Sequence, residues 1–149
     1  MEFDPVTDYP LGSRRPDLVS TPGGIPLAEV TLEALRADRI VGEEIRATPE
    51  TLARQAEVAG AAGRPQLAEN LARAAELASV PADVILEIYT ALRPHRSTAA
   101  ELDDWAGRLE SDYGAPLAAS FLREAQEVYA ERGLLARAPG GPRIDRAAV

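Results

Sequence analysis

Apolar residues recur at helical spacing between Thr48 and Thr98, and proline and glycine divide this stretch into three predicted helices. Thr48 is suited to cap the first helix, Pro49 to occupy its first turn, and Gly63 to end it. The second helix begins at Pro65, with Leu67, Leu71 and Ala74 on one face. The third extends from Pro81 to Pro94, and its predicted buried stripe is Ile85, Ile88, Tyr89 and Leu92.

Two further helices follow. Thr98 and Glu101 form a capping-box pattern that predicts the start of a fourth helix, and Gly114 is suited to end it. Its predicted apolar face is Leu102, Trp105, Ala106, Leu109 and Tyr113. A fifth helix is predicted from about Pro116 to Arg132, with Leu117, Phe121, Ala125 and Val128 facing inward. The pattern indicates an all-α fold, a compact bundle of about five helices, with no strand.

Residues 1–47 differ from this helical part because five prolines recur up to Pro26 and exclude a long helix there. Short helical turns are expected around Thr31–Ala37 and Gly42–Ile45. We therefore predict an extended, irregular arm over 1–47, a helical domain over 48–135 and a flexible tail over 136–149. The apolar residues of the arm suggest that it lies in a groove of its own chain or of a partner, and we expect that a larger companion covers it.

Composition excludes several classes of protein. The chain has 16 basic and 24 acidic residues and a net charge of −8, and every basic residue is arginine. Nucleic-acid binding would need a local basic stripe, and the candidate group Arg93, His95 and Arg96 is too small. The chain has no cysteine, and no apolar run reaches the roughly 18 residues of a membrane span. Its acidic, proline-containing N-terminus does not resemble a secretory signal, so we expect a cytoplasmic protein.

Reactive groups are few, and we predict no catalytic, cofactor-binding or metal-binding residue in this chain. His95 is the only histidine, and no serine lies in a nucleophile pattern. Asp103 and Asp104 could in principle bind a metal, but carboxylates in a first helical turn more simply complement the helix dipole. Trp105, at helical spacing, is interpreted as a core or interface anchor, with base or sugar stacking as the alternative.

Side chains that the helical core does not explain are candidates for contact with a partner. The candidate subunit-interface residues are Tyr9, Leu11, Arg14, Arg15, Leu18, Arg93, His95 and Arg96. For Tyr9 and the two neighbouring arginines, a solvated tail remains the alternative interpretation.

Four runs carry a resemblance to a known family: YPLGSRRPDLVSTPGG, TLEALRADRI, the block ATPETLARQAEVAGAAGRPQLAENLARAAELASVPADVILEIYTALRPHRST, and LESDYGAPLAASFLREAQEVYAERGLL. Together they cover about residues 9–135. The chain resembles the small (gamma) subunit of adenosylcobalamin-dependent propanediol and glycerol dehydratases. The resemblance implies a hydro-lyase of three different subunits, two copies of each, that converts 1,2-propanediol or glycerol to an aldehyde and water by a radical mechanism.

The resemblance also implies a division of labour. The large subunit carries the active site, adenosylcobalamin lies between the large and medium subunits, and the small subunit has a structural and assembly role. Some relatives have a longer N-terminal extension for packing into a bacterial microcompartment, and since only MEFDPVTD precedes Tyr9, we do not expect such targeting here. The alternative function is a non-enzymatic helical adaptor or regulatory protein.

Overall fold

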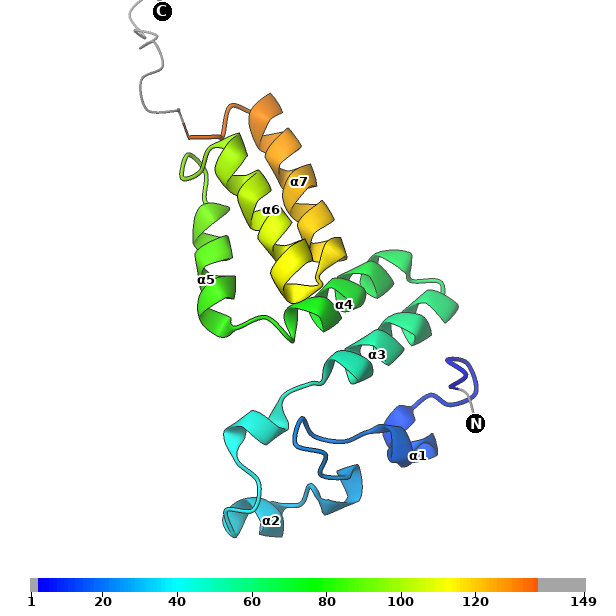
Figure 1. Cartoon of the computed structure of the whole chain (residues 1–149). Coiled ribbons are helices and arrows are strands. Elements are labelled where there is room, and N and C mark those ends of the chain that lie inside the picture. Colours follow the sequence, from blue (N-terminus) through cyan, green and yellow to red (C-terminus); the bar gives the residue numbers. More distant parts are fainter. Residues whose placement is uncertain (1–2, 137–149) are drawn as a thin grey trace, which may run out of the picture. The chain divides into compact units, whose positions relative to one another are not determined.

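The computed structural model describes residues 3–136 and has an all-α fold, which confirms the predicted class (Figure 1). No β-strand occurs in this range; Ser20 and Pro26 form an isolated bridge. By their internal contacts the residues separate into two compact units, Met1–Ser79 and Val80–Val149. The helical domain predicted over 48–135 is divided at Ser79, because α3 and α4 lie in the same unit as the arm. The tail predicted over 136–149 lies outside the described residues, except for Ala136.

Two antiparallel helices dominate the first unit, α3 (Pro49–Ala61) and α4 (Pro65–Leu77). The Thr48 side chain caps α3 by accepting a hydrogen bond from the Thr51 N–H, as predicted. Gly63 has φ +70°, a left-handed conformation that glycine adopts without steric cost, so the chain reverses there and Pro65 begins α4.

The described part of the N-terminal arm, residues 3–47, forms five short helical turns, of which only the two around Thr31–Ala37 and Gly42–Ile45 were predicted. The five turns are α1 (Leu11–Arg14), η1 (Pro16–Leu18), η2 (Leu27–Glu29), α2 (Leu32–Arg36) and η3 (Gly42–Ile45). Thr31 caps α2 by accepting a hydrogen bond from the Ala34 N–H. The arm is joined to α3 by the guanidinium of Arg54, which donates a hydrogen bond of 2.8 Å to the Leu18 carbonyl. Leu11, Ala34 and Ile40 are the buried apolar residues of the described part of the arm.

The second unit contains α5 (Ala82–Ala91), α6 (Ala99–Tyr113) and α7 (Pro116–Glu131). The predicted capping box is present: the Glu101 N–H donates to the Thr98 side chain, and the Thr98 N–H donates to the Glu101 carboxylate. Gly114, at φ +61°, ends α6, and α7 returns beside it (Figure 1). The buried side chains of these two helices and the turn between them are Leu102, Ala106, Leu109, Ala115, Ala118, Ala119 and Leu122.

Two predicted buried faces are wrong in part. On α5, Ile88 is buried, but Tyr89 is 63% exposed. On α7, the predicted inward residues Leu117, Phe121 and Val128 are exposed, and the helix instead buries Ala118, Ala119 and Leu122. The face that packs is therefore displaced by about one position, because small alanine side chains let α6 and α7 approach closely and leave the larger side chains outside.

We predict that Thr98→Ala lowers the free energy of unfolding by about 1 kcal/mol, because α6 loses the acceptor for its first-turn amide. Thr90→Ala is the matched control. The Thr90 hydroxyl bonds the Leu86 carbonyl within α5, and such bonds add little to helix stability. Urea unfolding of both variants measures the difference, and equal losses would contradict the capping role.

We also predict that Arg54→Leu loosens the arm, because a hydrogen bond from a charged donor is worth about 1.5–3 kcal/mol. Amide hydrogen exchange between Leu18 and Leu27 should become roughly tenfold faster or more. Arg54→Lys, which keeps a charged donor, should lie between the variant and the wild type. Arg46→Leu, at an exposed site of the arm, is the control and should leave the exchange rate between Leu18 and Leu27 unchanged. An equal acceleration in this control would contradict the role of Arg54.

Candidate functional site

The predicted interface residues of the arm have different environments. Tyr9 is 56% exposed and Arg14 is exposed, whereas Leu11 is buried and Leu18 is half-buried. Since Leu11 is already covered within its own unit, little of its side chain remains for a partner. The Leu18 carbonyl accepts the hydrogen bond from Arg54, so the backbone of Leu18 helps to fix the arm on α3.

Arg15 is held by two carboxylates of its own arm. Its guanidinium lies 2.9 Å from Asp8 Oδ2 and 3.0 Å from Asp17 Oδ2. The hydrogen bond from Arg15 lowers the pKa of Asp17, and the same bond raises the pKa of Arg15. Arg15 therefore orders residues 8–17, and Arg14 is the member of the pair whose side chain is exposed.

An apolar groove of about 830 Å³ lies in the first unit between the arm and the α3–α4 hairpin. Its arm side includes Val6, Tyr9 and Leu27, and its helix side includes Val58 and Leu71. Polar groups at the groove are few and include Thr51, Gln55 and Arg64. The arm thus lies along its own chain, in line with one of the two placements considered for it, while leaving apolar surface open.

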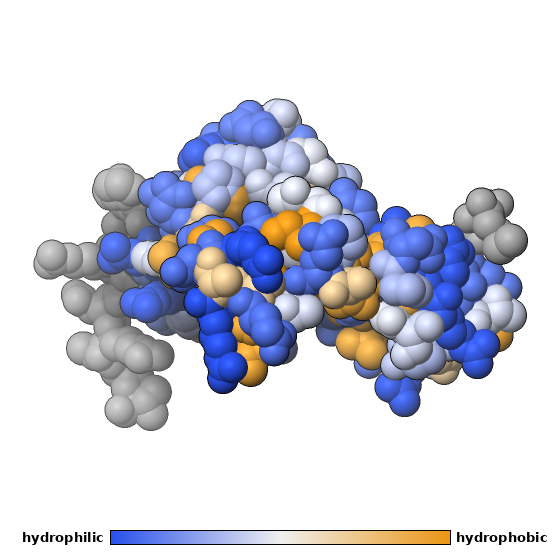
Figure 2. Space-filling model, turned by 90° about the horizontal axis from the view of Figure 1, so that it is seen from below, coloured by the Kyte–Doolittle hydropathy of each residue, from blue (hydrophilic) through white to orange (hydrophobic). Residues whose placement is uncertain are grey.

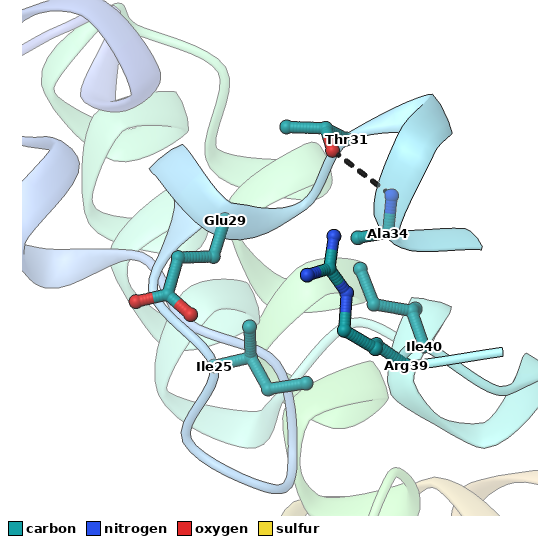
Figure 3. Close-up of a pocket in the computed structure, with 6 residues that line it drawn as sticks. All are labelled: Ile25, Glu29, Thr31, Ala34, Arg39 and Ile40. Carbon is teal, nitrogen blue, oxygen red and sulfur yellow. Dashed lines mark hydrogen bonds between the residues drawn. The ribbon is translucent and has the colours of Figure 1, made fainter. Parts of the chain in front are cut away.

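A smaller pocket of about 300 Å³ lies within the arm itself (Figure 3). The Arg39 guanidinium points into the space between the other lining residues, which are Ile25, Glu29, Thr31, Ala34 and Ile40. The Thr31 hydroxyl is engaged as the cap of α2. The charged groups of the pocket are thus the Arg39 guanidinium and the Glu29 carboxylate, and the other walls are mainly apolar. Such a lining suits the packing of a partner side chain more than a catalytic reaction.

Arg93, His95 and Arg96 lie together in the loop between α5 and α6, and all three are exposed. Three hydrogen bonds join this loop to α7 and to the residues that follow it. The Tyr129 hydroxyl donates to the Leu92 carbonyl at 2.6 Å, the His95 N–H donates to the Leu134 carbonyl at 2.6 Å, and the Ala136 N–H donates to the Ser97 carbonyl at 2.8 Å. His95 has φ +62°, which is uncommon for a residue other than glycine. The loop is therefore fixed in one conformation.

The acidic pair at the start of α6 does not form a metal site with other ligands. Within residues 3–136, no group of three or more histidine, cysteine, aspartate or glutamate side chains lies close enough to hold a metal ion. Asp103 lies 3.5 Å from the Arg123 guanidinium, which also pairs with Glu110 at 2.7 Å. The hydrogen bond from Arg123 lowers the pKa of Glu110. These carboxylates are thus part of an ion-pair group that joins α6 to α7.

Trp105 is half-buried on α6, and its ring is covered by the guanidinium of Arg108, whose Cζ lies 4.1 Å from the ring centroid. This stacking within one helix occupies one face of the indole. The observation favours the anchor interpretation of Trp105 over stacking on a base or sugar.

Sequence reasoning missed several residues that organise these surfaces. Arg54 and Tyr129 each bond a carbonyl at least 36 positions away in the chain, and a local pattern carries no signal for such a contact. Leu86, 65% exposed on α5, was not singled out because the stripe was placed on Tyr89 instead. On the face drawn in Figure 2, apolar side chains form small groups between polar ones. None of the helices in the described range is long and apolar enough to cross a membrane.

Comparison with known proteins adds to this geometry. The family described as "Dehydratase small subunit" matches residues 5–136. The propanediol dehydratase small subunit of Citrobacter freundii is 50% identical over 127 residues, which cover 85% of this chain and 74% of that protein. The propanediol dehydratase small subunit of Salmonella typhimurium is 49% identical over 127 residues, covering 85% of this chain and 73% of that protein. The match extends over the arm, all five long helices and the loop of Arg93, and the chain therefore belongs to the dehydratase small subunit family.

Proposed function

We propose that this chain is the small accessory subunit of an adenosylcobalamin-dependent diol dehydratase, a hydro-lyase that converts 1,2-propanediol to an aldehyde and water. Both relatives bear the name of propanediol dehydratase, which favours this substrate over glycerol. The role of the chain is structural. It binds the large and medium subunits, in a complex with two copies of each of the three subunits, and leaves the chemistry to them.

The observation that carries the structural role is an inverted distribution of apolar side chains. Among residues 3–136, half of the fourteen buried apolar residues are alanine, whereas thirteen larger apolar side chains are exposed. Large apolar side chains that lie together at a protein surface mark sites of protein binding, whereas singly scattered ones are ordinary. In this chain, small side chains fill much of the core, and we infer that the large exposed ones contact partner subunits.

The arm holds the densest group of such residues. We call it the arm surface; its members are Val30, Leu32, Leu35, Val41 and Ile45, between 38% and 62% exposed. They occur within residues 30–45, on and beside α2 and η3. Fully burying a side chain of this size contributes about 1.5–3 kcal/mol, and because these five are already partly buried, each contributes roughly half of that on association. This supports the expectation that a larger companion covers the arm.

The described side chains do not fit a corrin cofactor. The only imidazole of the chain, His95, is in an exposed loop, and the apolar groove in the first unit offers few polar groups to a corrin's amide side chains. We therefore assign adenosylcobalamin to the other subunits and derive no step of the reaction from this chain.

The experiment is co-expression of the chain with the large and medium subunits of the same dehydratase. We predict a stable complex that contains all three and forms aldehyde from 1,2-propanediol, and a clear loss of complex stability when this chain is omitted. Full activity and unchanged thermal stability without the chain would refute the accessory role. A chain that stays monomeric beside the other subunits would support the adaptor alternative.

Variants of the arm surface test the observation itself. Leu35→Ser with Val41→Ser should weaken incorporation into the complex at least tenfold, since each truncation removes about 1–2 kcal/mol of apolar contact. Glu33→Ser with Arg36→Ser is the matched control, because it changes exposed polar positions of the same helix. Competition between tagged wild-type and variant chains during assembly measures the effect. Equal incorporation of both double variants would contradict a docking role for the arm surface.

A further inference from the structure

The outward face of α5 carries two large apolar side chains close to the cationic loop. Leu86 and Tyr89 are 65% and 63% exposed, and they lie three positions apart, on one side of the helix. Ile88 and Ala91 are buried on the opposite side. Arg93, also exposed, lies two positions beyond the end of α5, so the cationic loop begins directly after the helix that carries these side chains.

The loop after α5 is held in place by several hydrogen bonds. Its Leu92, His95 and Ser97 backbone groups are bonded to Tyr129, Leu134 and Ala136. The Arg96 N–H also donates to the Arg93 carbonyl at 3.1 Å, which makes a tight turn between the two arginines. A surface that is ordered before binding loses less conformational entropy on association.

Among the residues that the structure describes, the two arginines of the turn have no acidic partner. Neither guanidinium forms an ion pair with any residue in the range 3–136, although the chain is strongly acidic overall. The arginines that form ion pairs, Arg15 and Arg123, are half-buried, whereas Arg93 and Arg96 are exposed and their guanidinium groups are available to a partner. Tyrosine and arginine are the residue types most enriched at the centres of protein interfaces.

We propose that Leu86, Tyr89, Arg93 and Arg96 form a second docking surface, the α5 surface, for another subunit of the dehydratase. The complementary surface is an apolar patch bordered by two carboxylates, which accept hydrogen bonds from the two guanidinium groups. This inference rests on the proposed function, because that function supplies the partner. It adds a contact in the second unit, independent of the arm surface in the first.

Charge and geometry favour a protein partner with discrete carboxylates. A polyanion such as a nucleic acid would meet the field of a chain with net charge −8, whereas two carboxylates at contact distance act locally. The planar guanidinium also matches a carboxylate through two parallel hydrogen bonds. The neighbouring leucine and tyrosine need an apolar counterpart, which a carboxylate-bordered protein patch provides.

The test uses the assembled three-subunit complex and the isolated chain. Hydroxyl-radical footprinting should find Tyr89 reactive in the isolated chain and at least fivefold less reactive in the complex. Arg93→Glu with Arg96→Glu should lower incorporation of the chain at least tenfold in the competition assay, and so should Leu86→Ser with Tyr89→Ser. Asp83→Asn with Glu87→Gln, at other exposed positions of α5, is the matched control and should incorporate like the wild type.

Each contrary result has a defined meaning. If the wild-type chain assembles but the α5 variants incorporate normally, the α5 surface is overturned and the proposed function stands. If Tyr89 is equally protected in the isolated chain, the surface is covered by the chain itself and the proposal is also overturned. A dimer of the isolated chain that Arg93→Glu abolishes would assign the surface to a second copy instead. Circular dichroism of each variant, with Arg93→Gln and Arg96→Gln as milder substitutions, separates lost binding from lost folding.

Discussion

Close packing of alanine between α6 and α7 is the constraint on which the second unit depends. Ala106 on α6 and Ala119 on α7 are fully buried, and Leu102, Leu109 and Leu122 fill the remaining space. Alanine lets two helices approach closely but removes little apolar surface from water. The packing of α6 on α7 therefore buries little apolar area per residue, and larger side chains such as Leu117 and Phe121 remain exposed.

The first unit also has a small apolar core, and polar contacts add to its stability. Its arm has few buried side chains, and ordered hydrogen bonds supply part of the stabilisation that a larger core would give. Arg54 binds the arm to α3 through the Leu18 carbonyl, Arg15 joins Asp8 to Asp17, and the Glu44 carboxylate accepts from the Gly23 N–H at 3.0 Å. These contacts shape the arm while the five side chains of the arm surface stay exposed.

Local signals in the sequence predicted the helix ends well. Thr48, Thr98, Gly63 and Gly114 act within a few residues of themselves, so the printed sequence contains all the information needed for their role. The prolines of the arm predicted the absence of a long helix before Pro26, whereas the turns α1 and η1 that lie among them were not predicted. The all-α class and the family resemblance rested on these signals too.

The inward faces of α5 and α7 could not be predicted from the same pattern. Hydrophobicity ranks Tyr89, Phe121 and Val128 above alanine, and in a protein that works alone such residues would form the core. In a subunit, apolar residues serve two cores, one within the chain and one shared with a neighbour, and periodicity does not distinguish them. The long-range bonds of Arg54 and Tyr129 were equally inaccessible, because nothing near either residue indicates its acceptor.

The bonds from Leu134 and Ala136 to the loop of Arg93 have an evolutionary consequence. They make the few residues after α7 part of the support for a loop that lies nearly 40 positions earlier. A homologue that ended before this segment would have to stabilise the loop by other means, such as a glycine in place of His95. Among family members, the length of chain after the last helix and the residue at this left-handed position should therefore vary together.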